Sequence, residues 1–287
     1  MTDILQAIAT IIDNPIGDLL SSYPSQSKNR IQAVGEALES FVKDAFANTI
    51  DEPDFCNKRK KYNELFSFEG NNNNPPDFMI RNGDAIEVKK IQSPGAPIAL
   101  NSSYPKSKLF SNDPQISPAC RKCETWTEKD IVYAIGVTSN DTKPTLKMLW
   151  LIYGDCYAAS KEYYEQIREQ IATGINAIRG VTFSKTIELG KVKKVDPLGI
   201  TSLRIRGMWN INNPAKVFAH INTGYGRQTN FQLIAIMKES KYSSFPDDSR
   251  EMIESISLPG FNINTQRIKC PDNPVNLIPA KIITYNI

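Results

Sequence analysis

The amino-acid sequence contains no long apolar run, and none approaches the ~18 residues that a membrane-spanning helix requires. Its N-terminus also lacks a basic segment followed by an apolar one, which is the pattern of a secretion signal. Membrane insertion and secretion are therefore not indicated, and we expect a cytoplasmic protein. With 40% hydrophobic and 23% charged residues, the composition is that of a globular chain rather than a disordered one.

Residue types that often carry catalysis or bind zinc are scarce. Histidine occurs once, at His220, and among the five cysteines only Cys120 and Cys123 have the spacing of a metal-binding pair. A structural zinc site needs four ligands, so this set disfavours one. The formal net charge of only +3 does not by itself indicate a nucleic-acid partner, although basic residues cluster locally.

No internal repeat or linker-like stretch divides the 287 residues, so we predict a single domain over residues 1–287. Near-continuous apolar runs at residues 131–137 and 146–153 are typical of central strands buried on both faces. Residues 29–47 and 160–178 have the periodicity of amphipathic helices. Helices on both sides of a mixed sheet make this an α/β fold. Further strands are predicted at residues 66–68, 231–237 and 281–287.

The segment from Gly70 to Lys90 is the most informative part of the chain, because apolar and polar residues alternate in it. In a strand, Ile86 and Val88 point to one face, while Glu87 and Lys89 share the other. Residues 77–80 alternate in the same way. The Asn-Gly pair between the two runs is typical of a β-hairpin turn.

The length of the hairpin loop decides on which face Asp77 lies. A two-residue turn would pair Asp77 with Val88 and place the carboxylate on the apolar face, where it loses its hydration. A three-residue loop with Gly83 in the left-handed conformation pairs Asp77 with Glu87 instead. We predict this second register, which brings two carboxylates and the Lys89 ammonium together on one face.

Two carboxylates beside an ammonium suit Mg²⁺-assisted phosphodiester hydrolysis. Magnesium prefers carboxylate oxygens and retains waters that can attack phosphorus, so Asp77 and Glu87 are the predicted metal ligands. Lys89 can orient the attacking water or stabilise charge in the transition state. The same three residue types also occur on ordinary surface hairpins, and the short pattern does not exclude that alternative.

The pair Pro76–Asp77 followed by Glu87–Val88–Lys89 resembles the signature of PD-(D/E)xK nucleases. The wider sequence resembles the NgoPII family of type II restriction endonucleases, from about residue 26 to the C-terminus. The segments that carry this resemblance are residues 74–77, 83–91, 99–103, 105–109, 200–209 and 280–285.

The resemblance implies a restriction-endonuclease-like core, with a mixed β-sheet flanked by helices and loop insertions for DNA recognition. It implies Mg²⁺-dependent hydrolysis of double-stranded DNA at a short palindrome, with GGCC as the expected target and 5′-phosphate ends. A palindrome fits a homodimer, because the two-fold axis of the protein then matches that of the DNA. A DNA methyltransferase is the expected genetic partner.

Glu39 is the predicted fourth acidic residue of the site. It lies on the flank of the apolar stripe of the helix at residues 29–47. From this position its side chain can extend along the sheet surface towards the hairpin. The helix before the core sheet often supplies such a glutamate in the PD-(D/E)xK superfamily. The alternative is an exposed helical acid that pairs with Lys43 four residues on.

Residues beyond the hairpin are predicted to contact DNA. The polar loop at residues 93–112 offers short hydrogen-bond donors and cations for phosphates and base edges. In a strand, Arg204 and Arg206 share a face, which suits guanine recognition, while phosphate anchoring or a salt-bridged strand explains the pair equally well. The predicted DNA-binding residues are Lys90, Asn101, Ser102, Ser103, Lys106, Lys108, Arg204, Arg206, Trp209 and Arg227.

Two other functions remain open from the sequence. One is a non-catalytic, sequence-specific DNA-binding module. The complete set of Asp77, Glu87 and Lys89 argues against this function, because a module that only binds DNA does not need all three. The other is a structure-specific repair or junction nuclease built on the same core. Cleavage of a linear duplex at one short sequence would distinguish restriction from both.

Overall fold

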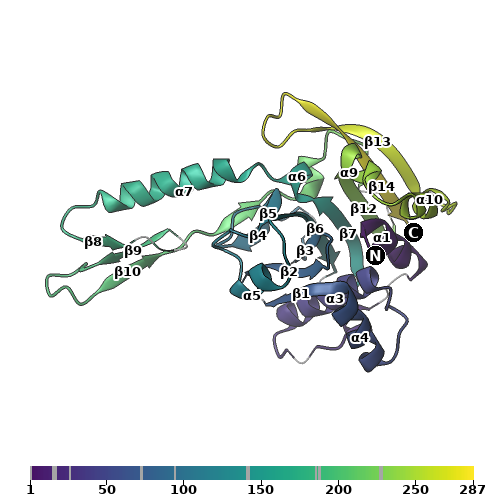
Figure 1. The fold of residues 1–287 in the computed structure, drawn as a ribbon, viewed down its shortest axis with the longest axis horizontal. Coiled ribbons are helices and arrows are strands. Elements are labelled where there is room, and N and C mark those ends of the chain that lie inside the picture. Colours follow the sequence, from purple (N-terminus) through teal and green to yellow (C-terminus); the bar gives the residue numbers. More distant parts are fainter. Residues whose placement is uncertain are drawn as a thin grey trace.

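The computed structural model describes residues 2–14, 18–25, 27–71, 74–93, 95–139, 143–184, 186, 189–225 and 229–287. Its centre is a mixed β-sheet with the strand order β1-β2-β3-β6-β7-β12-β14-β13, to which the short β5 adds beside β6 (Figure 1). The strands are β1 (Phe66–Asn71), β2 (Asn74–Ile80), β3 (Ala85–Ile91), β5 (Lys108–Phe110), β6 (Glu128–Thr138), β7 (Leu146–Tyr153), β12 (Gln232–Lys238), β13 (Asn262–Lys269) and β14 (Leu277–Asn286).

The middle of the sheet is buried on both faces. Strand β3 runs parallel to β6, and β7 runs parallel to β12, while β6 and β7 are antiparallel neighbours. Nearly every side chain of β7 and β12 is buried, as their apolar runs predict. The predicted α/β class with a mixed sheet is therefore confirmed.

One side of the sheet is covered by N-terminal helices (Figure 1). Helix α3 (Arg30–Ala47) begins where the Asn29 side chain accepts a hydrogen bond from the Ile31 N–H, and it ends at Asn48 in the left-handed conformation. Its apolar stripe is buried, as predicted. Helix α1 (Ile4–Asp13) packs on α3 and buries most of its apolar residues. Helices α2 (Leu19–Ser22) and α4 (Phe55–Leu65) complete this layer.

Short elements surround the other parts of the sheet. Strands β4 (Ile98–Asn101) and β11 (Trp209–Ile211) form a separate two-stranded ladder that closes one wall of a cleft described below. The remaining helices of the described body are α5 (Pro118–Lys122), α6 (Gly154–Tyr157), α8 (Pro214–Val217), α9 (Glu239–Ser243) and α10 (Asp247–Glu254). None of the helices within the described ranges is long and apolar enough to cross a membrane.

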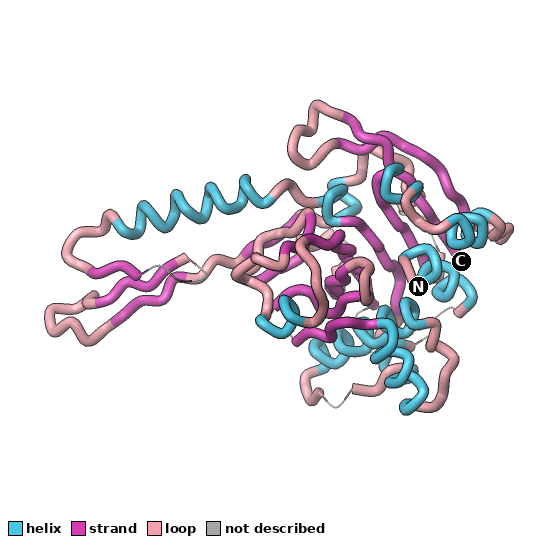
Figure 2. The backbone as a smooth tube through the Cα atoms, viewed as in Figure 1, coloured by secondary structure: helices cyan, strands magenta, loops and turns pink. Residues whose placement is uncertain are grey.

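An arm, which we define as residues 161–205, projects from this body (Figures 1 and 2). It consists of helix α7 (Lys161–Asn176) and a three-stranded sheet of β8 (Thr182–Ser184), β9 (Gly190–Lys193) and β10 (Ser202–Ile205) in the order β10-β9-β8. The predicted helix at residues 160–178 therefore forms, but the expectation that it covers the core sheet is wrong. Helix α7 has no buried residue. It packs mainly against the small sheet of the arm, and near its start Tyr164 contacts Tyr104 and Trp209 of the body.

Candidate active site

The hairpin of β2 and β3 has the three-residue loop that the sequence predicts. Phe78 lies opposite Ile86, and the Ile80 N–H donates to the Asp84 carbonyl over 2.9 Å. One detail of the loop differs from the prediction. The left-handed residue is Asn82, with φ of 56°, and not Gly83. Asparagine tolerates this conformation, so the glycine is not needed for it.

Asp77 replaces a strand–strand hydrogen bond with its side chain. The register between β2 and β3 is the predicted one, but the ladder ends at Phe78, so Asp77 comes level with Glu87 without pairing with it in the ladder. The Val88 N–H, which would otherwise lack a partner from β2, donates instead to Oδ2 of Asp77 over 2.6 Å. This bond fixes the half-buried carboxylate beside the two side chains on β3.

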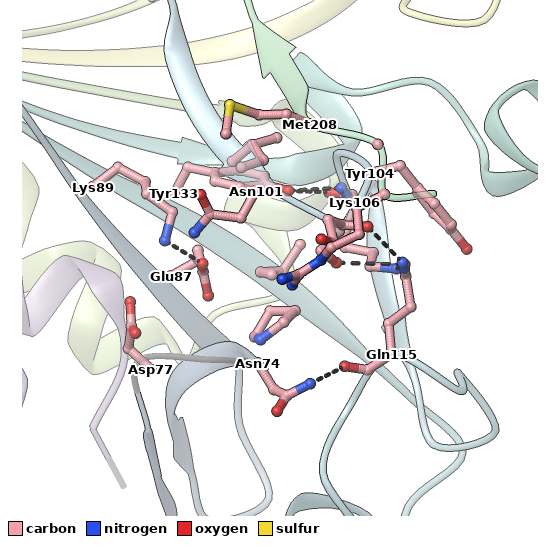
Figure 3. Close-up of a pocket in the computed structure, with 17 residues that line it drawn as sticks. Asn74, Asp77, Glu87, Lys89, Asn101, Tyr104, Lys106, Gln115, Tyr133 and Met208 are labelled. Carbon is pink, nitrogen blue, oxygen red and sulfur yellow. Dashed lines mark hydrogen bonds and ion pairs between the residues drawn. The ribbon is translucent and has the colours of Figure 1, made fainter. Parts of the chain in front are cut away.

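Glu87 and Lys89 lie next to one another on β3 and face the same cleft as Asp77 (Figure 3). The Lys89 ammonium lies 2.5 Å from Oε1 of Glu87, and Glu87 is only 8% exposed. The other carboxylate oxygen of Glu87, Oε2, is buried and accepts no hydrogen bond. A buried carboxylate oxygen without a donor is costly, and a cation is the partner that it fits.

The electrostatics of the site come from burial and from crowded charges. Burial, followed by repulsion from Glu87, raises the pKa of Asp77 well above its ordinary value. Glu39 raises this pKa as well, while Lys89 lowers it. For Lys89, burial alone would lower the pKa, but attraction to Glu87 and Asp77 outweighs burial, so the pKa is raised above its ordinary value. The lysine is therefore an ammonium at neutral pH.

The two carboxylates fit a magnesium ion. Within the described ranges, no three His, Cys, Asp or Glu side chains are placed to hold a metal ion by themselves. Magnesium, however, is usually bound by one or two carboxylates together with waters and substrate phosphates. Asp77 and Glu87 supply that number. A bound cation would give Oε2 of Glu87 a partner and would offset the repulsion between the two carboxylates that raises the pKa of Asp77.

Glu39 lies close enough to influence the site electrostatically, but its carboxylate has a partner of its own. It acts on the pKa values of both Asp77 and Lys89. Its Oε1 lies 2.8 Å from Nζ of Lys43, four residues along α3, and the Lys43 ammonium also approaches Glu69 at 3.5 Å. The role of Glu39 as a fourth acidic residue stays a prediction.

The predicted DNA-binding loop borders the same cleft, which has a volume of about 500 Å³. Asn101, Ser102 and Ser103 line it next to the hairpin, and Arg206 reaches it from the base of the arm. Trp209, directly after this base, pairs with Asn101 in the ladder of β4 and β11. Its ring lies edge-on to those of Tyr104 and Tyr164, which anchors the arm to the body.

Lys106 lines the cleft but directs its ammonium inward. The residue is 4% exposed, and Nζ lies 2.5 Å from Asp113 and 2.8 Å from Gln115, over the ring of Tyr104. Burial lowers the pKa of Lys106, and Asp113 partly offsets this effect. In this structure the side chain supports the polar loop from behind.

Other predicted DNA contacts lie away from the cleft. Lys90 is on the opposite face of β3 and donates to the Ile31 carbonyl over 3.2 Å. Lys108 on β5 pairs with Glu128 at 2.8 Å. Arg204 lies on β10 in the arm, and Arg227 falls outside the described residues.

Tyr133 and Gln115 also line the cleft, and neither is predicted from the sequence. Tyr133 on β6 is the parallel neighbour of Glu87, and its hydroxyl accepts from the Lys106 N–H over 2.6 Å. In the sequence it is one more residue in an apolar run, and only its phenolic hydroxyl marks it as different. Gln115 donates to the Ser102 carbonyl over 2.9 Å and thereby holds the polar loop at residues 93–112 in place. No local sequence pattern predicts this contact.

The mixed sheet and the acidic, lysine-containing cleft at its β2–β3 hairpin define a protein of the restriction-endonuclease-like class. Comparison with known proteins gives the family. The family model of the NgoPII restriction endonuclease matches residues 2–269. A relative named "Type II restriction enzyme NgoPII", from Neisseria gonorrhoeae, is 44% identical over 287 residues, which cover 99% of this chain and 100% of the relative. No solved structure matches.

The chain therefore belongs to the NgoPII restriction endonuclease family. It is a type II restriction endonuclease, an enzyme that cleaves DNA at specific sites. The family resemblance read from the sequence is confirmed.

Proposed function

We propose that this enzyme hydrolyses both strands of duplex DNA at GGCC in a Mg²⁺-dependent reaction that leaves 5′-phosphate and 3′-hydroxyl ends. The observation that carries the chemistry is the placement of Asp77, Glu87 and Lys89 in one cleft, with Oε2 of Glu87 unpartnered. The target sequence is the one associated with the family. A methyltransferase that protects the same site in the host belongs to this proposal.

Each residue of the site has a separate task in this mechanism. Asp77 and Glu87 would hold Mg²⁺, which supplies Lewis-acid activation of the phosphate and lowers the pKa of a bound water. The Val88 N–H keeps the Asp77 carboxylate in position, and Lys89 does the same for Oε1 of Glu87. Because Lys89 is protonated, it orients water or stabilises the growing negative charge, and it does not act as a general base.

The test of this proposal is digestion of a plasmid whose sequence is known, followed by sequencing of the ends. We expect discrete fragments that all end within GGCC, that carry 5′-phosphates, and that form only with Mg²⁺ and not with EDTA. Prior methylation of GGCC sites should block cleavage. Discrete ends at another sequence would reject GGCC as the target but leave the cleavage mechanism standing. Preferential cutting of branched DNA would favour a junction nuclease. Binding of the duplex without cutting would favour a DNA-binding module.

The arm offers a second surface for the duplex. In the register of its sheet, Lys193 lies between Thr182 and Ser202, and Lys191 lies between Ser184 and Arg204. These six side chains therefore share one face, which we name the basic face of the arm, and all are cations or hydroxyls. The opposite face carries Phe183 and Val192. Since Arg206 continues from β10 into the cleft, the basic face is placed to follow phosphates away from the cleavage site.

Substitution of both lysines of the basic face by alanine should weaken binding of all duplexes and flatten its dependence on salt. Each phosphate contact contributes about 0.9 to the slope of log K against log salt, so we expect the slope to fall by about 2. Fluorescence anisotropy between 50 and 300 mM salt measures it. Lys269→Ala, on the far edge strand β13, removes an exposed charge elsewhere and is the control. An unchanged slope in the double variant would exclude the basic face from DNA binding.

A further inference from the structure

Gln115 connects two segments of the cleft wall that are far apart in the sequence (Figure 3). Its side-chain Nε2 donates to the Ser102 carbonyl over 2.9 Å, and its Oε1 accepts from the Ser103 hydroxyl over 3.4 Å. On the other side, the Gln115 carbonyl accepts from Nδ2 of Asn74 over 2.8 Å. Asn74 is the first residue of β2, three residues before Asp77. One residue therefore joins the polar loop to the strand that carries a proposed metal ligand.

Gln115 is itself held in one place by buried charged groups. The Lys106 ammonium donates to Oε1 of Gln115 over 2.8 Å and pairs with Asp113 at 2.5 Å. Oδ1 of Asp113 accepts from the Gln115 N–H over 2.8 Å. All three residues are buried, and we name Lys106, Asp113 and Gln115 the Gln115 cluster. Buried polar groups that satisfy one another specify a single arrangement, so we expect the cluster to move as a unit.

The Gln115 cluster also reaches the surroundings of the second carboxylate. The Lys106 N–H donates to the Tyr133 hydroxyl over 2.6 Å, and this hydroxyl donates back to the Lys106 carbonyl over 3.2 Å. Tyr133 lies beside Glu87 in the ladder of β3 and β6. On the loop side, the Ser103 N–H donates to the Leu100 carbonyl over 3.2 Å and closes a tight turn. The same cluster thus contacts a compact turn of the loop and the neighbours of both carboxylates.

We infer that Gln115 is a positioning residue that makes the placement of Asp77 depend on the base pairs that the polar loop contacts. The inference rests on the proposed function, in which residues 101–103 contact the duplex and Asp77 binds the cation. A loop seated on the correct base pairs holds Gln115 and, through Asn74, the start of β2 in the arrangement that aligns the carboxylate. At a wrong base pair the loop is displaced, and a misplacement of about 1 Å at the reacting groups costs ~10²-fold in rate. Gln115 thereby adds to the discrimination that base contacts give through binding alone.

Two substitutions in the full-length enzyme break this connection at different points. Gln115→Met keeps the size of the side chain but removes its bonds to the loop, and Asn74→Ala removes the bond to β2. Single-turnover cleavage rates are measured on the sequence that the plasmid digestion identifies and on a duplex that differs from it by one base pair. We expect the ratio of the two rates to fall by about 10-fold in each variant, within the usual range of couplings between sites. A loss of folded protein would slow both reactions equally and leave the ratio unchanged.

The double variant shows whether the two residues act through one connection. Once the connection is broken at Asn74, a second break at Gln115 should change the ratio little further, whereas two independent DNA contacts would multiply their effects. Gln266→Met is the matched control and should leave the ratio unchanged. The Gln266 amide also holds a loop, because it donates to the Asn222 carbonyl over 2.7 Å and accepts from the Asn222 N–H over 2.9 Å, but it lies on the far edge strand β13.

The possible results separate the positioning role from the proposed function. Circular dichroism checks the fold of every variant, and if Gln115→Met is unfolded, Asn74→Ala alone must lower the ratio. An unchanged ratio in Asn74→Ala, or multiplied effects in the double variant, would overturn the positioning role and leave the proposed function standing. A wild-type enzyme that cuts both duplexes at the same rate would overturn the proposed function together with the inference.

Discussion

Replacement of Lys89 by alanine is expected to slow cleavage of a GGCC duplex by about 10²–10³-fold, the usual effect of removing one electrostatic stabiliser of a transition state. The ammonium lies 2.5 Å from Oε1 of Glu87 and is surrounded by acidic side chains that keep it protonated. Without it, the Glu87 carboxylate loses its fixed orientation as well as the positive charge. Single-turnover rates at saturating Mg²⁺ measure the loss in the chemical step.

Two comparisons separate this effect from a loss of folding or of DNA affinity. Lys147→Ala removes an exposed lysine from β7 and should cleave at the wild-type rate. Lys89→Ala should still bind the GGCC duplex in EDTA with nearly wild-type affinity, because the residue acts on the transition state. If Lys89→Ala cleaved within a few-fold of the wild-type rate, the assignment of this cleft as the catalytic site would be wrong.

Asp77→Asn is expected to abolish Mg²⁺-dependent cleavage and at the same time to stabilise the metal-free protein. The wild-type carboxylate is half-buried next to Glu87, and its pKa is raised well above the ordinary value of 3.8. A raised pKa in the folded state favours folding only while the group is protonated, so this contribution is lost as the pH rises through the folded-state pKa. Asparagine has no charge to bury, yet its side-chain oxygen can still accept the Val88 N–H.

Thermal unfolding in EDTA at several pH values checks the second part of this prediction. At pH 8, we expect Asp77→Asn to unfold at a higher temperature than the wild type, by about 2–4 °C for each kcal/mol gained. The difference should shrink as the pH falls towards 4, where the wild-type carboxyl is also uncharged. Asp51→Asn, at an exposed position, is the control and should show no such trend. A less stable Asp77→Asn at pH 8 would contradict the proposed crowding of charge.

The hairpin and the central strands could be predicted from the sequence because their patterns are local. Alternation fixes the face of Glu87 and Lys89, and the continuous apolar run of β12 predicts burial on both sides. The position of the left-handed residue could not be predicted, because both Asn82 and Gly83 tolerate that conformation. The end of the β2–β3 ladder at Phe78 depends on where β2 leaves β3, which no short pattern specifies.

Other features depend on contacts between residues that are distant in the sequence. The periodicity of α7 correctly gives a helix with one apolar side, but periodicity does not say what covers that side. The sequence placed Lys106 in a polar loop, where a lysine is usually solvated. In the fold, Asp113 and Gln115 return to this loop and bury the ammonium. Such contacts are set by the tertiary structure, and a single sequence carries little signal for them.

Asp77 and Glu87 are the proposed ligands of the catalytic cation, and the whole mechanism depends on this role. A crystal structure of the enzyme with Mn²⁺ and a GGCC duplex that carries a non-hydrolysable linkage at the cleavage position tests it. We expect an anomalous manganese peak bound by both carboxylates and by an oxygen of the target phosphate, with the Lys89 ammonium beside it. A manganese peak away from the β2–β3 hairpin, or a target phosphate bound elsewhere on the protein, would contradict the assignment.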